Sequence, residues 1–509
     1  MKTIKCLFGL LTAFLLLFNV TLVTSASAQT RVTFGVTEPV VSYNPYGDSV
    51  ALMYGVWCEV IGCLGTYDFR QGKYVGRLAE RWEVDKKDPR HWIFYLRKNY
   101  KRSDGSIVVA EDVVHSINRI KTDPQSKQGG IVRQITKVEA LDRFTVRITT
   151  KKPFATLMVN LFDSVFITSK AIYDKYGPKV ADRKYPIGAG PYKLKEIVLG
   201  SRLVLEKIPG HPDARSDTPD IVIYQLMKEP EQRITALLND EIQIAQFVPP
   251  HLEKRISGSP KLKLVSHDAL EIMFLAMSPK FKPWDNKLLR KAVAHAIDRK
   301  LIIKNMLRGQ ASRLDGPLGP SQYGYDPNLQ PRYVYDSEKA RALVKRAGFP
   351  NGVDVDFYTP VGRYINDKQI AQAMTGMLND VGIRAKLHTP EWSTLWANIQ
   401  KGKIPFYYIG RGAVFDPGRA LRQYFGTGGS KRIQYSNPRV DALLSEADQS
   451  FDENKRKAVL SKLMSIITDD APAHFLWRHK MLFGVSKNVD YVPRPDGRVY
   501  INEDLRMRR

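Results

Sequence analysis

The chain has 509 residues, 43% of them hydrophobic, and carries a formal net charge of +26. This composition supports a sizeable buried core and two or three domains, and it excludes a disordered or low-complexity chain. The basic residues are spread along the sequence without a basic run or a nucleic-acid-binding motif. We therefore interpret the charge as a solvated basic surface and expect no nucleic-acid partner.

The first 28 residues have the pattern of a secretory signal. After a lysine-containing start, a mostly apolar stretch runs from Leu7 to Val23, and small residues follow at Ala26 to Ala28. The stretch is short for a membrane span. Cys6 precedes it, so this cysteine is not the lipid acceptor of a lipoprotein signal. We predict cleavage after Ala28 and a periplasmic mature protein.

Two cysteines, Cys58 and Cys63, remain after cleavage. In an oxidising compartment they can form a disulfide. A spacing of five residues on a helix does not point the two side chains together, so a bridge requires the helix to end between them. The alternative is a pair of small buried thiols.

Strand signals dominate the first 150 residues. Alternation predicts strands at Val32–Val36, Trp92–Arg97 and Phe144–Ile148. A short helix at Val113–Ile120, introduced by an Ala-Glu-Asp segment, separates the last two.

From about residue 278 the pattern changes to alternating helices and strands. A single helix is predicted from Leu288 to Leu307, capped by Asp285 or Asn286 and ended by Gly309. Its apolar stripe consists of Leu289, Val293, Ile297 and Leu301.

The following segments alternate as in a βαβ sheet, in which ligands bind at the carboxyl ends of the strands. Predicted strands lie at Val353–Phe357, Ile383–Leu387 and Ile404–Gly410, with helices at Ile370–Val381 and Trp392–Gln400 between them. A helix at Lys455–Asp470 follows, and the tail from Lys480 to Arg509 is strand-like and predicted to return to the first domain.

The sequence contains none of the common catalytic or phosphate-binding motifs. The segment Gly188–Tyr192 begins like a dinucleotide loop, but Pro191 and the missing third glycine favour a tight turn before a strand. His474 and His479 do not have a standard metal-ligand spacing. We therefore expect neither an enzyme nor a bound cofactor or metal.

Four passages form an ordered series along the mature chain. They are Gly76–Val84 with Phe94–Lys98, Ser103–Ser106 and Ala110–Ile117; Gly188–Leu194; Leu288–Val293 with Ala296–Arg299; and Tyr435–Leu444. In this order they resemble bacterial periplasmic solute-binding protein family 5, the peptide- and nickel-binding component of ABC importers.

The resemblance implies an α/β fold, a two-lobed clamp of the periplasmic-binding-protein type with an additional strand-rich domain. Its implied divisions are a signal peptide (1–28), a first domain in three parts (29–71, 187–270 and 479–509), a second domain (72–186) and a third (271–478). It also implies a monomer that captures a small molecule between the first and third domains and delivers it to an inner-membrane ABC permease.

Peptide-binding relatives hold the ligand's carboxylate with an arginine in a loop that Thr359–Tyr364 resembles, and Arg363 matches that arginine. The alternative is an ordinary exposed loop arginine. The relatives' amine-binding aspartate precedes an Asp-Pro pair, here Asp416-Pro417, and its place falls on Ala413 or Val414. The resemblance therefore implies a cationic anchor without the usual acidic one, and Asp416 itself is expected to be structural.

From this we hypothesise a peptide-like or otherwise carboxylated ligand without a conventionally bound free α-amine, such as a blocked peptide, an opine-like conjugate or a sugar acid. Longer peptides bound through their backbones remain an alternative. The candidate ligand-binding residues are Tyr43, Asn44, Trp57, Ala276, Arg363, Trp392, Tyr407, Ile409, Gly410, Arg411, Ala413 and Phe415.

Two other classes stay open on the sequence alone. One is a receptor for haem or a metal complex on the same scaffold, which an absorbance band or the metal content of the native protein would favour. The other is a basic surface or adhesion protein without a transport role, which neighbouring permease and ATPase genes would argue against.

Overall fold

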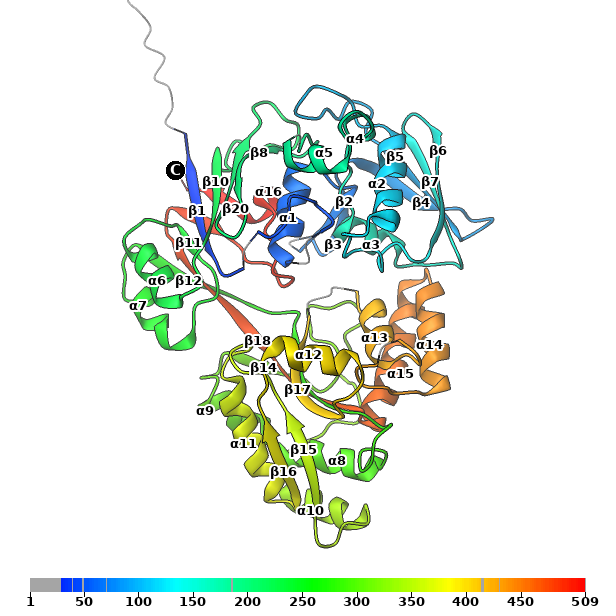
Figure 1. The fold of residues 1–509 in the computed structure, drawn as a ribbon, viewed down its shortest axis with the longest axis vertical. Coiled ribbons are helices and arrows are strands. Elements are labelled where there is room, and N and C mark those ends of the chain that lie inside the picture. The colour runs from blue at the N-terminus through cyan, green and yellow to red at the C-terminus, as the bar shows by residue number, and fades with distance from the viewer. Residues whose placement is uncertain are drawn as a thin grey trace, which may run out of the picture.

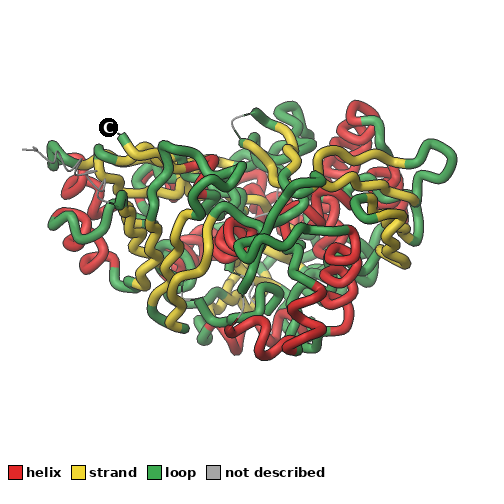
Figure 2. The backbone as a smooth tube through the Cα atoms, turned by 90° about the horizontal axis from the view of Figure 1, so that it is seen from above, coloured by secondary structure: helices red, strands yellow, loops and turns green. Residues whose placement is uncertain are grey.

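The computed structural model describes residues 29–508, apart from positions 39, 48–49, 70, 185, 413–415 and 430. The predicted signal peptide and two candidate site residues, Ala413 and Phe415, lie outside the described residues. The fold has an upper and a lower lobe, separated along most of the view in Figure 1 and connected by the long strand β18. Helices and strands are interspersed along the whole molecule when it is seen from above (Figure 2).

The upper lobe is built on the sheet around β1. This strand pairs in parallel with β10 and β11, and the sheet continues antiparallel through β9 to β8. The bounds of the elements in this part are β1 (Arg31–Val36), α1 (Ala51–Val60), β8 (Tyr192–Val198), β9 (Arg202–Lys207), β10 (Ile221–Leu226), α6 (Pro230–Leu238), β11 (Ile244–Ala245), η1 (Pro250–Leu252), α7 (Glu253–Ser257), β12 (Leu262–Asp268), β19 (Val489–Tyr491), α16 (Ile501–Asp504) and β20 (Leu505–Met507).

A strand-rich region completes the upper lobe, on the right in Figure 1. Its antiparallel sheet has the order β4-β5-β7-β6, beside a hairpin of β2 and β3. The elements are β2 (Gly65–Asp68), β3 (Lys73–Gly76), β4 (Ala79–Val84), β5 (His91–Leu96), α2 (Ala110–Thr122), β6 (Ile135–Asp142), β7 (Thr145–Thr150), α3 (Leu157–Ser164), α4 (Lys170–Tyr176) and α5 (Pro178–Lys184). One face of β5 and β7 is buried and the other partly open, which explains the alternation in their sequences.

The lower lobe is the α/β unit predicted from the sequence. Strands β15 and β16 are parallel, and the end of β15 also pairs in parallel with β17. The elements are β13 (Ile272–Met277), α8 (Lys287–Ala296), α9 (Arg299–Asn305), β14 (Ala311–Arg313), α10 (Ser337–Arg346), β15 (Val353–Tyr358), α11 (Asp367–Asn379), β16 (Ile383–His388), α12 (Trp392–Gln400), β17 (Phe406–Arg411), α13 (Gly418–Phe425), α14 (Pro438–Gln449) and α15 (Glu453–Asp470).

The lower-lobe sheet is covered on both faces. Every residue of β13 and β17 is buried, and alternate side chains of β13 enter two different hydrophobic clusters. A strand buried on both faces requires a continuous apolar run, which is what the sequence of β13 provides. The boundaries of the three predicted domains stay predictions.

Strand β18 (Ala473–Ser486) joins the two lobes. Its first half pairs with β13 and β14 of the lower lobe, and its second half pairs with β11 and β12 of the upper lobe. The chain also crosses between β12 and β13, where the Ala269 N–H donates to the His479 carbonyl at 2.9 Å. Beside this point Arg478 and Asp268 form an ion pair of 2.6 Å.

The single helix predicted from Leu288 to Leu307 is wrong. Asn286 caps α8 as expected, but α8 ends at Ala296 and a separate helix, α9, begins at Arg299. The side chain of Asp298 accepts a hydrogen bond from the Leu301 N–H and starts the new helix. Leu301, the last member of the predicted stripe, is 47% exposed.

Helix α1 ends at Val60, between the two cysteines, and a disulfide joins Cys58 to Cys63. Gly62 follows the helix end with a φ of +93°, a conformation that glycine adopts without steric cost. This turn returns the chain so that the two Cα atoms lie 5.1 Å apart.

Removing this disulfide is expected to lower the free energy of unfolding by about 2 kcal/mol, because the bridge closes a short loop in the unfolded chain. The measurement is urea unfolding of the protein with and without a reductant. The Cys58→Ser/Cys63→Ser double variant is the control, since its unfolding midpoint should not respond to the reductant. An unchanged midpoint for the reduced wild-type protein would contradict the prediction.

Candidate ligand-binding site

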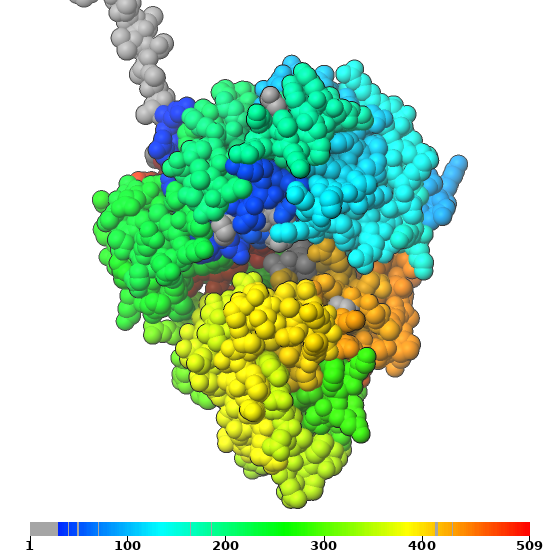
Figure 3. Space-filling view, viewed as in Figure 1, coloured from blue at the N-terminus to red at the C-terminus, as the bar shows by residue number. Residues whose placement is uncertain are grey.

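The candidate site lies where β15 and β17 end, on the side of the lower lobe that faces the upper lobe. Helices α12 and α13 border this end of the sheet (Figure 1). A space-filling view shows a hollow between the two lobes at this level (Figure 3). Carboxyl ends of parallel strands are the usual ligand-binding edge of an α/β sheet.

The loop after β15 is held by the buried carboxylate of Asp367, at the start of α11. This carboxylate accepts hydrogen bonds from the backbone N–H groups of Gly362, Arg363 and Tyr364 at 3.0, 2.8 and 3.0 Å. A carboxylate at a helix start is favoured by the helix dipole as well as by these donors. The Asp367 carboxylate therefore fixes the conformation of this loop, and its oxygens are occupied by these hydrogen bonds.

Arg363 extends from this loop with an exposed side chain. Its guanidinium lies 5.5 Å from the ring centroid of Tyr364 and 5.3 Å from that of Trp392. Among the described residues, this guanidinium has no ion pair and donates no hydrogen bond. Its planar fork of donors is thus available to a carboxylate.

A row of aromatic and cationic side chains continues from Arg363 across α12 and α13. Trp392 stacks on Trp396 with ring centroids 5.2 Å apart. Arg432 then lies 4.6 Å from the Trp396 ring and 5.0 Å from the Tyr424 ring. The row offers flat apolar surfaces with positive charge between them.

Arg411 ends β17 and is only 4% exposed. One terminal nitrogen, Nη2, donates to the Pro317 carbonyl at 2.7 Å, while Nη1 has no hydrogen-bond partner in the described part of the chain. Burial lowers the pKa of Arg411 to about 10, so the guanidinium remains charged at neutral pH. A buried cation with an unused donor is a costly arrangement unless an anion or water completes it.

Glu271, which is not among the site residues predicted from the sequence, lies directly before β13 and is partly buried. A Cβ atom at Gly410 would come within 2.8 Å of both Glu271 Oε1 and Tyr364 Cε1, so the carboxyl group occupies the space that a side chain at position 410 would need. The available signal was an acid immediately before an uninterrupted apolar strand.

Burial raises the pKa of the Glu271 carboxyl to about 7. Arg363 opposes this rise by favouring the charged form, and Glu38 of the upper lobe adds to it by repulsion. The site therefore contains an acid close to the arginine predicted from the resemblance, and a second acid acts on it from the opposite lobe.

Other candidate residues of the lower lobe lie in the sheet beneath the site. Ala276, Tyr407 and Ile409 are completely buried in one hydrophobic cluster. The Tyr407 hydroxyl donates to the Arg432 carbonyl at 3.2 Å and so supports the aromatic row from below.

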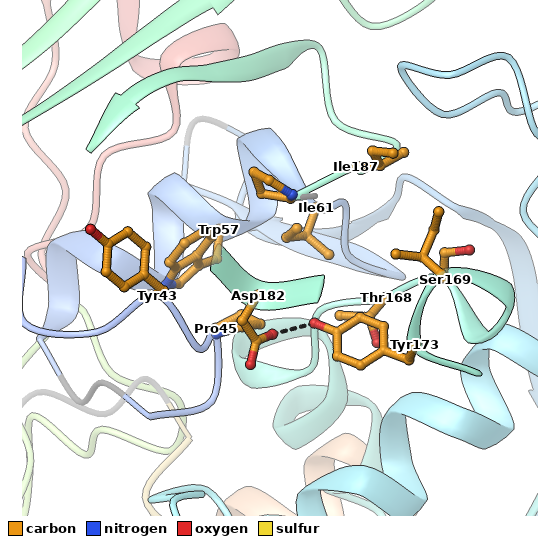
Figure 4. Close-up of a pocket in the computed structure, with 11 residues that line it drawn as sticks. Tyr43, Pro45, Trp57, Ile61, Thr168, Ser169, Tyr173, Asp182 and Ile187 are labelled. Atoms are coloured by element: carbon orange, nitrogen blue, oxygen red, sulfur yellow. Dashed lines mark hydrogen bonds between the residues drawn. The ribbon is translucent and has the colours of Figure 1, made fainter. Parts of the chain in front are cut away.

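The upper-lobe candidates Tyr43 and Trp57 line a separate small pocket (Figure 4). The pocket contains a hydrogen bond between the Tyr173 hydroxyl and Asp182. Asn44 is buried, and its amide donates to Asp123 at 2.8 Å while its carbonyl oxygen accepts from the backbone of Tyr46. Asn44 therefore holds its own loop in place.

The described residues contain no group of three or more His, Cys, Asp or Glu side chains arranged to hold a metal ion. His474 and His479 are buried in β18, and burial lowers the pKa of both imidazoles. No described helix is long and apolar enough to cross a membrane.

Comparisons with known proteins place the chain in a family. The chain is 27% identical over 461 residues to the glutathione-binding protein GsiB of Pectobacterium atrosepticum, covering 88% of each chain. It is 27% identical over 453 residues to the dipeptide-binding protein of Escherichia coli, covering 83% of this chain and 84% of the relative. The solved structure of a Pseudoalteromonas dipeptide-binding protein with Met-Leu has the same fold, with a TM-score of 0.79, 19% identity, and coverage of 94% of this chain and 100% of that one. The model of the bacterial extracellular solute-binding proteins, family 5 (middle region), matches residues 73–432, and the chain belongs to this family.

Proposed function

We propose that the protein is the extracytoplasmic receptor of an ABC import system and captures a peptide or another carboxylated small molecule between its lobes. The single observation that supports this best is the environment of the Arg363 guanidinium. Its guanidinium is exposed in the loop after β15, lies over the Trp392 ring, and has no ion-pair or hydrogen-bond partner among the described side chains. A ligand carboxylate would complete it with two charge-assisted hydrogen bonds.

The cellular setting follows from the same proposal. The mature chain begins at Gln29 after removal of the signal peptide, acts in the periplasm as a monomer, and hands its cargo to an inner-membrane permease. Names of relatives that bind glutathione and dipeptides favour a peptide-like cargo. We assign the protein no enzymatic role and no cofactor.

Arg411 is the second cationic group of the proposed site. Its unused Nη1 donor favours an anion, or water held by one, at the end of β17. The aromatic row from Trp392 to Tyr424 would provide the apolar walls for a side chain of the ligand. Ala276, Tyr407 and Ile409 would shape the site from within the sheet without contacting the ligand.

The purified mature protein is first mixed with an equimolar dipeptide library that includes Met-Leu and its C-terminal amide, and native mass spectrometry identifies the retained members. Binding of Met-Leu and of the amide is then measured by calorimetry. We expect amidation to weaken binding about 10- to 100-fold, since it removes a charge-assisted contact of roughly 1.5–3 kcal/mol. Arg363→Gln should weaken binding of the free acid by a similar factor and leave that of the amide nearly unchanged.

Arg346→Gln is the matched control, because Arg346 is exposed at the end of α10, at the lower tip of the molecule. It should bind both compounds like the wild-type protein. Retention of no library member would overturn the proposed ligand class, and equal binding of acid and amide would overturn the role of Arg363.

A further inference from the structure

The carboxylates near the site differ in whether other residues already bind their oxygens. Asp367 holds the loop that carries Arg363. Asp416, which follows β17, pairs with Arg456 at 2.7 Å and accepts from the Gly418 N–H at 2.9 Å. Neither carboxylate is free to take a ligand group.

Glu271 is different. Among the described residues its carboxylate accepts no hydrogen bond and forms no ion pair within 4 Å, even with neighbouring Arg363. The chain folds this acid against Gly410 and the Tyr364 ring, where water access is reduced. An ionised carboxylate in such a place is costly unless a cation or hydrogen-bond donors compensate it.

The two unpaired groups restrict the ligand. A purely anionic ligand bound at Arg363 would cover Glu271 and leave a negative charge buried without a partner, which is unfavourable. A purely cationic ligand bound at Glu271 would cover Arg363 and leave its positive charge without a partner. A ligand with both charges completes both side chains at once.

We propose that Glu271 is the acidic anchor of this site and binds the ammonium group of a zwitterionic ligand whose carboxylate is held by Arg363. The inference rests on the proposed function and deepens it. It also replaces the earlier hypothesis of a ligand without a bound α-amine: the acid has not been lost but has moved from the segment after β17 to the start of β13. Glu38, which repels Glu271 from the upper lobe, adds negative charge on the other side of the same subsite.

The experiment removes either the positive charge of the ligand's ammonium group or the negative charge of Glu271. Binding of Met-Leu and of N-acetyl-Met-Leu is measured by calorimetry for the wild-type protein and for Glu271→Gln. Acetylation should weaken binding to the wild-type protein at least 10-fold. Glu271→Gln should weaken binding of Met-Leu by a similar factor but change that of the acetylated peptide less than 3-fold, so the preference for the free amine disappears.

Glu338→Gln is the matched control, an identical substitution at an exposed position at the start of α10. Its preference for the free amine should equal that of the wild-type protein, and thermal unfolding establishes that each variant is folded. If the wild-type protein binds both peptides alike, or Glu271→Gln keeps the preference, the assignment of Glu271 is wrong while the receptor function stands. If neither peptide binds any variant and no library dipeptide is retained, the proposed ligand class fails, and this inference with it.

The pH dependence of binding provides an independent test. The groups that face Glu271 are Arg363 and Tyr364 from the loop after β15, Tyr408 from β17, Tyr424 from α13 and Glu38 from the upper lobe. Burial raises the pKa of all three tyrosines, so they stay neutral between pH 5.5 and 7.5.

An ammonium group binds the ionised form of Glu271, whose pKa is raised to about 7 in the free protein. Protonation below that pH competes with the ligand, so the affinity for Met-Leu should fall roughly 15- to 20-fold from pH 7.5 to pH 5.5, with the partial loss of the ligand ammonium at pH 7.5 included. The ligand carboxylate stays ionised over this range, and the α-amine is fully charged at pH 5.5 and about 60–75% charged at pH 7.5. Glu271→Gln should lose this slope and the Glu338→Gln control should keep it; the reverse pattern would overturn the assignment.

Discussion

The arrangement of the two lobes depends on the hydrogen bonding of strand β18, together with a contact in which the Ala155 N–H of the upper lobe donates to the Asp448 carbonyl of the lower lobe at 2.7 Å. Strand β18 belongs to the sheets of both lobes, pairing with β13 and β14 in its first half and with β11 and β12 in its second. Since these ladders fix both halves, a relative movement of the lobes has to be absorbed near the middle of β18 and in the adjacent crossing from β12 to β13. The ion pair of Arg478 with Asp268 lies at this point.

This constraint explains why the candidate site is close to the crossing. Glu271 follows the crossing segment directly and begins β13, while Arg363 comes from the end of β15 in the same sheet. A ligand that bridges these two side chains would contact the lower lobe at the position where its chain departs to the upper lobe. Binding and lobe movement are therefore expected to be coupled through a short path of covalent and hydrogen-bonded structure.

Much of the fold was predictable because its sequence patterns are local. The βαβ unit from Val353 to Arg411 follows from alternation and helix periodicity, and the buried strand β17 from its apolar run. The break between α8 and α9 was not predicted, because the side chain of Asp298 competes with an apolar stripe that by itself favours a continuous helix. The start of β18 at Ala473 was also missed, since its pairing partners are distant in sequence.

The site was predictable only where a residue could be matched to a motif. Arg363 was found in this way, whereas Glu271 is not adjacent in sequence to any other member of the site. Its role depends on β13 lying beside β17, which brings Glu271 against Gly410 across more than a hundred residues. The same pairing places Tyr407 and Ile409 inside the sheet, where they serve as support.

The charges on the two lobes suggest how a ligand would favour the closed receptor. In the free protein Glu38 and Glu271 repel each other across the lobes, and burial further penalises the charged form of Glu271. Bringing the lobes together over an empty site therefore costs free energy, either as repulsion or as the uptake of a proton. A ligand ammonium between the two carboxylates reverses the sign of that interaction. A ligand shifts a conformational equilibrium only by the difference between its affinities for the two states, here the open and the closed receptor. Because the attraction between the ammonium and both carboxylates exists only when the lobes are together, it would make closure depend on the bound ligand.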